Sequence, residues 1–293
     1  MSNSSVRLAL VSHPDDVAVR AEVVRRVHGG RVTVIADSME MALRDDDEFD
    51  AAVVCSSVDA RCAAESGKHV LVDAPVADSI EETQSILELV EKAGVFLEVG
   101  QLPRHAPANR TIMDRLSSGK LGDAGLLRIH RWSSKTKQSL ALKIFGDIDQ
   151  AVHLFDARPT EVYAIGRRNR SYVQIHLGFP EGGMAVLDFS ERLPEGLNYD
   201  SLSLIGSAGA AYADDHHNTH LLFAGKNLTA LISDSGNGQL HELQAFVDRV
   251  AQGDSPSIDS EAILAVHRVI NAVGRSIEST QVVRERGGVY EPA

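Results

Sequence analysis

The first hundred residues alternate short β-branched runs with longer segments whose apolar residues recur at helical spacing. The runs predict buried strands over residues 6–12, 31–37, 51–55, 69–72 and 95–99. Helices are predicted over residues 16–28 and 79–93, and the second begins with the capping box Ser79-x-x-Glu82. Because strands that alternate with helices pair in parallel, we expect an α/β protein with a Rossmann-like doubly wound sheet over residues 1–101.

The pattern changes after a predicted helix over residues 108–118. Apolar and polar residues then alternate, which is typical of an antiparallel sheet with one covered face, over residues 126–132, 161–167, 172–179, 184–190, 201–205 and 227–232. The segment Phe179–Met184 predicts a hairpin, and helices are predicted over residues 239–252 and 260–280. We therefore expect a C-terminal α+β domain over residues 102–293 with a large open, mainly antiparallel sheet.

Charge and composition exclude several classes of protein. Forty-one acidic and 29 basic residues give a net charge of −12, which argues against a nucleic-acid partner. No run of about 18 apolar residues is present, so we expect no membrane span. The N-terminus has no apolar signal core, which predicts a cytoplasmic protein, and the two cysteines, Cys55 and Cys62, predict buried thiols rather than a disulfide framework.

Three local stretches carry a family resemblance. They are Ser66-Gly-Lys-His-Val-Leu-Val-Asp-Ala-Pro75, Ser118-Gly-Lys-Leu-Gly122, and Ala245-Phe-Val-Asp248 followed by Gly253-Asp-Ser-Pro256. In this order the chain resembles the glucose–fructose oxidoreductase / inositol dehydrogenase family, known as Gfo/Idh/MocA. The resemblance implies a Rossmann-like half, a second half with an open sheet, and a nicotinamide cofactor, NAD(P), if the family's activity is retained.

The cofactor positions that the resemblance implies are changed in this chain. The family's Gly-x-Gly-x-x-Gly turn corresponds to Ser12, Pro14 and Val17, with His13 between the first two. Proline has no N–H to offer a phosphate, and valine would crowd the helix against the strand and the ligand. Asp37 stands where an acid binds the adenosine ribose hydroxyls, although an aspartate is also a common loop residue there.

The family's Glu-Lys-Pro motif corresponds to Asp73-Ala74-Pro75. In the family the lysine lies near the reacting carbon and helps a proton and a hydride to move together, which requires a cationic donor. Asp73 and Pro75 keep the turn beside the cofactor, whereas Ala74 cannot donate a proton.

The family's Asp-x-x-x-His-x-x-Asp motif fits the helix around residue 149 in two registers. In the first, His153 is the general base and Asp149 its neighbour one helical turn earlier. In the second, Gly146 takes the place of the histidine and Leu142 that of the upstream aspartate. We favour the second register, because it preserves the family's spacing to the strand that begins at Glu161. The first register stays open as the alternative.

Other candidate residues could have either a functional role or an ordinary structural one. Arg104 stands where family members present Arg or Tyr to the substrate, or it is an exposed arginine that leads a helix. Ser12-His-Pro-Asp-Asp16 also resembles the zinc-dependent N-acetylglucosaminyl deacetylases, but their distal histidine motif is missing. The polar stretch 214–220 is better explained as a turn between strands than as a metal site, so we expect no metal.

We therefore expect a Gfo/Idh/MocA-like protein that binds a small polar, sugar-like ligand without the usual lysine-assisted hydride transfer, as a binder or an enzyme of altered chemistry. The alternative is a divergent NAD(P)-dependent sugar or polyol oxidoreductase that uses His153 as its base. A structural partner is a third possibility. By the resemblance, we expect a homodimer or larger assembly through the C-terminal sheet, in which the segment Tyr172–Ser190 alternates suitably.

Overall fold

The computed structural model describes residues 5–12, 14–44, 48–100, 102–135, 139–167, 171–214, 219–224, 227–231, 238–253 and 259–293. The chain divides into two compact units. The first contains Met1–His105 and Gly236–Leu264, and the second contains Ala106–Ser235 and Ala265–Ala293. The sequence-based division assigned all of residues 102–293 to one domain, whereas in the structure the segment 236–264 belongs to the first unit.

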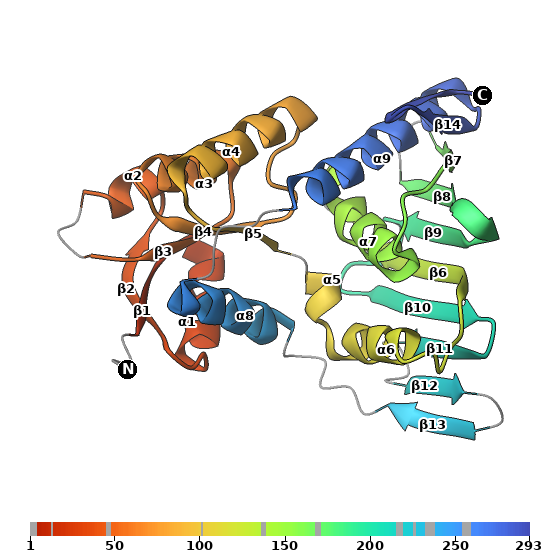
Figure 1. Cartoon of the computed structure of the whole chain (residues 1–293), viewed down its shortest axis with the longest axis horizontal. Coiled ribbons are helices and arrows are strands. Elements are labelled where there is room, and N and C mark those ends of the chain that lie inside the picture. Colours follow the sequence, from red (N-terminus) through yellow and green to blue (C-terminus); the bar gives the residue numbers. More distant parts are fainter. Residues whose placement is uncertain are drawn as a thin grey trace. The chain divides into compact units, whose positions relative to one another are not determined.

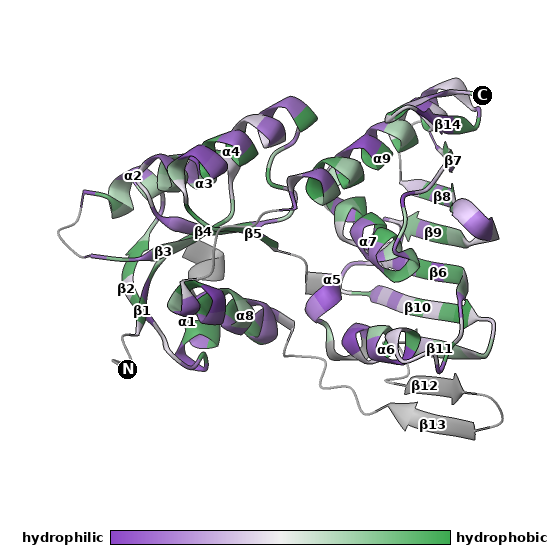
Figure 2. Ribbon diagram, in the orientation of Figure 1, coloured by the Kyte–Doolittle hydropathy of each residue, from purple (hydrophilic) through white to green (hydrophobic). Residues whose placement is uncertain are grey.

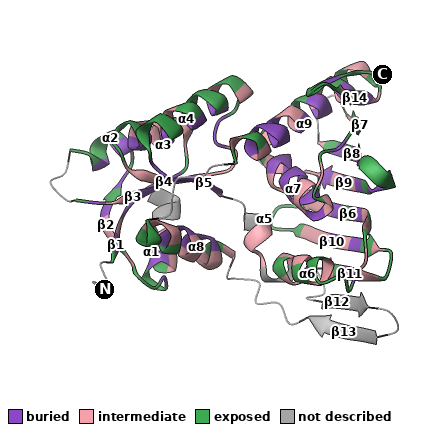
Figure 3. Cartoon of the chain, viewed as in Figure 1, coloured by how far each residue is buried: buried purple, intermediate pink, exposed green. Residues whose placement is uncertain are grey.

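The first unit is built on a parallel sheet with the strand order β2-β1-β3-β4-β5. The strands are β1 (Val6–Val11), β2 (Gly30–Ala36), β3 (Ala51–Val54), β4 (His69–Asp73) and β5 (Leu97–Gly100). Figure 1 shows helices on both faces of this sheet, and Figure 3 shows its central strands buried. The helices are α1 (Pro14–Arg25), α2 (Met39–Ala42), α3 (Ser57–Glu65), α4 (Ile80–Ala93), α5 (Leu102–His105) and α8 (Gly238–Gln252).

Three helices of the first unit, α2, α3 and α4, begin at serine caps that the sequence encodes. The side chain of Ser79 accepts a hydrogen bond from Glu82 N at 3.1 Å at the start of α4, as the capping box predicted. Gly94 ends α4 in the left-handed region, with φ 65°. Ser56 caps α3 in the same way as Ser79 caps α4. Figure 2 shows that these helices carry both hydrophobic and hydrophilic residues.

Helix α8 belongs to the first unit because its apolar face completes that unit's core. Phe246 stacks on Phe96, which directly precedes β5, with ring centroids 5.9 Å apart, and Val247 packs in the same cluster as Leu8 of β1. A Cβ added to Gly30 would lie 3.3 Å from Val247 Cγ2, so the helix approaches the start of β2 closely. This packing, between residues more than 140 positions apart, corrects the assignment of residues 239–252 to the second domain.

The second unit is built on a ten-stranded sheet with the order β13-β12-β11-β10-β6-β9-β8-β7-β14-β15. Neighbouring strands are antiparallel except for β6 and β9, which are parallel. The strands are β6 (Ala124–Ser133), β7 (Glu161–Gly166), β8 (Tyr172–Gly178), β9 (Met184–Ser190), β10 (Asn198–Gly206), β11 (Gly209–Asp214), β12 (Thr219–Ala224), β13 (Asn227–Leu231), β14 (Val283–Arg286) and β15 (Val289–Pro292).

One face of this sheet is covered by helices α6 (Pro107–Ser117), α7 (Leu140–Phe155) and α9 (Ser260–Ser279) (Figure 1). Alternate residues of a strand point to opposite faces of the sheet, so the period-2 pattern places apolar side chains on the face that the helices cover. In β8, for example, Val173, Ile175 and Leu177 are buried, while the residues between them are not. The predicted hairpin between β8 and β9 is present, with Phe179 N donating to Gly183 O at 2.8 Å.

The sequence reading missed the hairpin of β14 and β15. Its turn carries Gly287 and Gly288 with φ values of 62° and 88°, which is the geometry that Gly-Gly turns favour between two strands. The strands β11 and β12 pair with Asp214 opposite Thr219, so the polar stretch 214–220 joins two strands. Its residues 215–218 lie outside the described part of the chain.

Candidate functional site

The carboxyl ends of the first unit's parallel strands bring the predicted cofactor residues to one edge of the sheet. Ser12 follows β1, Asp37 follows β2, and Asp73 is the last residue of β4. Ser12 N donates to Ala36 O at 3.4 Å, which holds the ends of β1 and β2 together. In open parallel sheets this edge is where ligands bind.

Two residues, Ser12 and His13, separate β1 from α1, which begins at Pro14. Ser12 is 2% exposed, and its Oγ is a buried atom with no hydrogen-bond partner among the described residues. Pro14 is the first residue of α1, where its missing N–H costs the helix nothing. His13 and the side chain of Val17 lie outside the described residues.

Asp37 and Asp73 present carboxylates in different settings. Asp37 is exposed at the end of β2. Asp73 forms an ion pair with Arg20 of α1, and the two side chains are 46% and 21% exposed. A guanidinium stays protonated at neutral pH, so this pair supplies charge and hydrogen bonds but no proton for transfer.

The end of β4 is a tight backbone turn. The Ala74–Pro75 peptide bond is cis, and both residues are half-buried. On the neighbouring strand, a Cβ added to Gly100 would lie 3.3 Å from Val72 O, so β5 approaches β4 with no room for a side chain. At this strand end the methyl group of Ala74 follows Asp73, which forms the ion pair with Arg20.

The remaining predicted residues lie on helices. Arg104 is in α5, directly after β5 in the first unit, and is half-buried. Asp149 and His153 are one turn apart on α7 in the second unit, where Asp149 is 2% exposed and His153 is half-buried. Helix α7 ends at Phe155, and Asp156 follows in the left-handed region with φ 48°.

Helix α7 also carries two ion pairs that the sequence reading missed. Asp147 is 3% exposed and accepts from Arg131 of β6 through Nε at 3.1 Å and through Nη2 at 2.8 Å. One turn earlier, Lys143 pairs with Glu191, which follows β9. Lys143 and Asp147 have the i, i+4 spacing of one helix face, and this spacing in the sequence could have indicated a charged face on α7. A buried charge requires such a partner, so these pairs fix α7 on the sheet.

Within the ranges that the structure describes, no group of three His, Cys, Asp or Glu side chains could hold a metal ion. His13 begins the His-Pro-Asp-Asp sequence that resembles the zinc-dependent deacetylases, and it lies outside those ranges. None of the described helices combines the length and apolar character needed to cross a membrane.

Known proteins similar to this chain identify its family. Residues 3–101 match the model of the Gfo/Idh/MocA oxidoreductase family, described as having an NAD-binding Rossmann fold. The uncharacterized oxidoreductase YrbE of Bacillus subtilis (strain 168) is 30% identical over 234 residues, which are 69% of this chain and 68% of that protein. The chain belongs to the Gfo/Idh/MocA family.

Two solved structures show the Gfo/Idh/MocA fold over almost the whole chain. The aldose-aldose oxidoreductase from Caulobacter crescentus, complexed with glycerol, superposes with a TM-score of 0.82 at 15% identity and covers 96% of this chain and 100% of its own. Scyllo-inositol dehydrogenase from Lactobacillus casei, with NAD(H) and scyllo-inositol, gives 0.78 at 16% identity and covers 96% and 99%. The predicted family and fold class are confirmed.

Proposed function

We propose that this chain binds a small polar, sugar-like ligand and does not carry out the lysine-assisted hydride transfer of its family. The observation that carries the proposal is Ala74 at the end of β4, where the resemblance assigns the lysine. Its neighbour Asp73 is paired with Arg20, whose guanidinium does not release a proton near neutral pH. Among the described residues at the end of β4, a methyl group and a paired carboxylate therefore stand in place of the cationic proton donor of the family reaction.

The turn between β1 and α1 fits a dinucleotide pyrophosphate poorly. Pyrophosphate binding uses the N–H groups of a helix's first turn, and α1 begins with Pro14, which has none. The sequence also places two acidic residues, Asp15 and Asp16, in that turn. Asp37, exposed after β2, suits a ribose hydroxyl. On this proposal Asp37 is retained as a partner for the ribose, while Ser12, Pro14 and Val17 replace the glycines of the family's phosphate-binding turn.

The class of ligand rests on the relatives. The Caulobacter crescentus protein was crystallised with glycerol and the Lactobacillus casei enzyme with scyllo-inositol, both of which are polyols. Arg104 follows β5 at the carboxyl edge of the sheet, and we assign it to the ligand's hydroxyl groups. The ligand of this chain is then neutral or weakly charged and rich in hydroxyl groups.

The second candidate is a divergent NAD(P)-dependent sugar or polyol oxidoreductase. The match of residues 3–101 to a family with an NAD-binding fold favours it. In that case His153, on the last turn of α7, is the general base and Asp149 orients it. Lys143 and Asp147 are then part of the supporting helix face.

Titration with NADH and with NADPH separates the two candidates. We expect no saturable change in nucleotide fluorescence at micromolar to millimolar concentrations, because α1 lacks the first N–H of a phosphate site. Saturable binding of either nucleotide contradicts the cofactor part of the proposal. Circular dichroism of the same sample controls for folding.

If either nucleotide does bind, the variant Ala74→Lys tests the lysine part of the proposal, with Ala74→Met as a control of similar length. If scyllo-inositol or a hexose is oxidised with NAD(P)+ only by Ala74→Lys, the missing lysine is the cause of inactivity. If the unchanged chain already oxidises one of them, the proposal is wrong and the second candidate holds.

We also propose that the chain assembles through the open face of its second sheet. Large apolar side chains on that face remain exposed, among them Ile165 (53%), Tyr172 (45%) and Met184 (47%). Apolar side chains that gather on one sheet face are typical of a protein interface. The occupant that the family resemblance supports is a second copy of the chain.

A further inference from the structure

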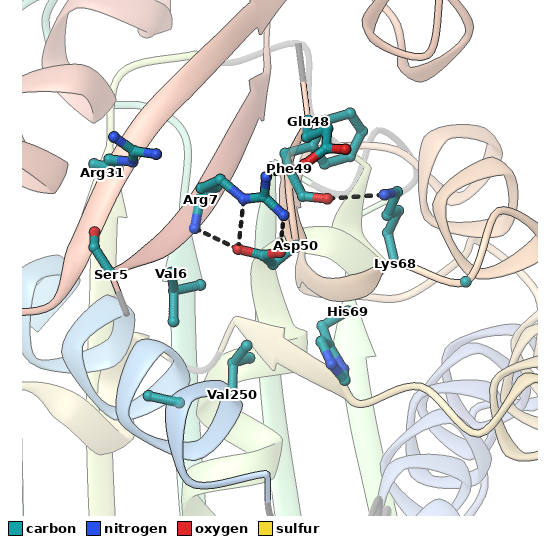
Figure 4. Close-up of a pocket in the computed structure, with 12 residues that line it drawn as sticks. Ser5, Val6, Arg7, Arg31, Glu48, Phe49, Asp50, Lys68, His69 and Val250 are labelled. Atoms are coloured by element: carbon teal, nitrogen blue, oxygen red, sulfur yellow. Dashed lines mark hydrogen bonds and ion pairs between the residues drawn. The ribbon is translucent and has the colours of Figure 1, made fainter. Parts of the chain in front are cut away.

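Histidine is the side chain whose charge changes near neutral pH, and its surroundings decide what that change does to the protein. His69 begins β4 and lines a pocket of about 950 Å³ at the amino ends of the first unit's strands. In Figure 4 its ring points away from Lys68, and its Nδ1 accepts a hydrogen bond from Phe96 N at 3.0 Å. Burial lowers the pKa of His69, so the ring stays neutral near neutral pH and keeps this bond.

His130 differs because it stands on the open face of the second sheet beside a carboxylate. Leu127 and Ile129 of β6 are buried, so His130, which alternates with them, lies on the face opposite the helices. Strand β9 places Asp188 beside it, and His130 Nδ1 lies 3.3 Å from Asp188 Oδ2. An ionised carboxylate only accepts, so Nδ1 carries the proton of the neutral ring, and Nε2 is the nitrogen that takes up a second proton. We call these two residues the His130–Asp188 pair.

The other charged residues near the pair on this face do not take the place of Asp188. Arg128, two residues before His130, faces the same side and makes no hydrogen bond or ion pair within the described part of the chain. On the other side of β6, β10 places Ser201 beside His130, and the next acidic residue in that row is Asp214 of β11, two strands away. Asp188 is therefore the carboxylate that a proton on His130 neutralises.

A second histidine of this face, His176 of β8, contacts no carboxylate among the described residues. Its Nε2 lies 3.3 Å from Gln174 Oε1, and the centroid of its ring lies 6.2 Å from that of Tyr163. A proton on His176 adds an unpaired positive charge to the face, whereas a proton on His130 completes an ion pair.

The His130–Asp188 pair lies between two groups of exposed apolar side chains. In the sheet order β11-β10-β6-β9-β8-β7 the pair occupies β6 and β9. Ile165 and Tyr172 are exposed on one side of it, and Ile205 (40%) and Tyr212 (39%) are exposed on the other, where the strand register places them on the face of His130. A second copy of the chain that covers both groups also covers the pair, whose side chains are 34% and 30% exposed.

We propose that assembly through this face takes up a proton at His130 in each copy and strengthens as the pH falls. With the ring neutral, the covered pair carries one negative charge, and removing an unneutralised carboxylate from water is costly. With the ring protonated, the covered pair has no net charge. The assembled form then holds this proton more tightly than the free form, so a lower pH shifts the equilibrium towards assembly. This inference rests on the proposed assembly of a second copy on this face.

Sedimentation equilibrium of the full chain at pH 8.0 and at pH 6.0 tests the inference through the dissociation constant of the assembly. We expect the Kd to be about tenfold or more lower at pH 6.0. His130→Gln keeps a hydrogen-bond donor for Asp188 but does not titrate, so its Kd should not fall at pH 6.0. His176→Gln removes the second histidine from the same face, and as the matched control it should keep the stronger association at pH 6.0.

Asp188→Asn is a second, independent variant, which should also lose the strengthening because it removes the carboxylate that the proton neutralises. Circular dichroism at both pH values controls for folding. A Kd that is equal at both pH values, or a fall at pH 6.0 that His130→Gln retains, overturns this inference and leaves the assembly itself standing. A chain that is monomeric at both pH values overturns the assembly as well.

Discussion

Thr280 follows α9 with a φ of 57°, a region that β-branched residues rarely adopt. The backbone turns there because Thr280 N donates to Ser276 O at 2.8 Å, and the side chain is exposed. Glycine adopts this conformation without steric cost, so Thr280→Gly is expected to stabilise the protein by about 1 kcal/mol. Thr280→Ala keeps the strain and is the control. Urea unfolding midpoints measure the difference, and a lower midpoint for Thr280→Gly than for Thr280→Ala contradicts the account.

His267, on α9, shows how packing between two helices creates a dependence on pH. Its ring packs edge-on against Phe145 of α7 with centroids 5.4 Å apart, and burial lowers the pKa of His267 to about 4. In the unfolded chain the ordinary pKa is about 6.5. The neutral ring therefore stabilises the fold above pH 6.5, and this contribution is lost as the pH falls towards 4, up to about 3 kcal/mol.

The variant His267→Phe removes this titration while it keeps an aromatic ring against Phe145. We expect the unfolding midpoint of the unchanged chain to fall more steeply between pH 7 and pH 4.5 than that of His267→Phe. Parallel pH profiles of the two proteins would show that His267 does not titrate on unfolding.

The open face of the ten-stranded sheet determines the expected assembly of the whole molecule. Met184→Asp and Tyr172→Asp place carboxylates on that face, and a buried unpaired charge is costly at an interface. We expect the mass from size-exclusion chromatography with light scattering to fall from two or more protomers to one. Val58→Asp, at a 72% exposed position of α3, is the control. A monomeric unchanged chain contradicts the proposed assembly.

Local patterns predicted the five strands of the parallel sheet and six strands of the second sheet, because a period of two residues is encoded in neighbouring positions, but they did not predict β11, β12, β14 and β15. The capping of α4 by Ser79 and the strand ends at Ser12, Asp37 and Asp73 could be read in the same way. The partners of the buried charges could not. Arg131 meets Asp147 only because β6 and α7 pack together, and Lys68 meets Phe49 only because β3 and β4 are neighbours. Such pairs follow from tertiary packing, which spacing in a single sequence does not encode.

The return of α8 to the first unit has a consequence for how the protein is made. Leu8, Val27 and Phe96 belong to a core that stays open on one side until residues 238–252 have left the ribosome. At about 10 residues per second, more than 130 residues of synthesis separate His105 from that helix, which is a delay of more than about ten seconds. During this interval the nascent N-terminal unit exposes an apolar surface that only its own later sequence can cover.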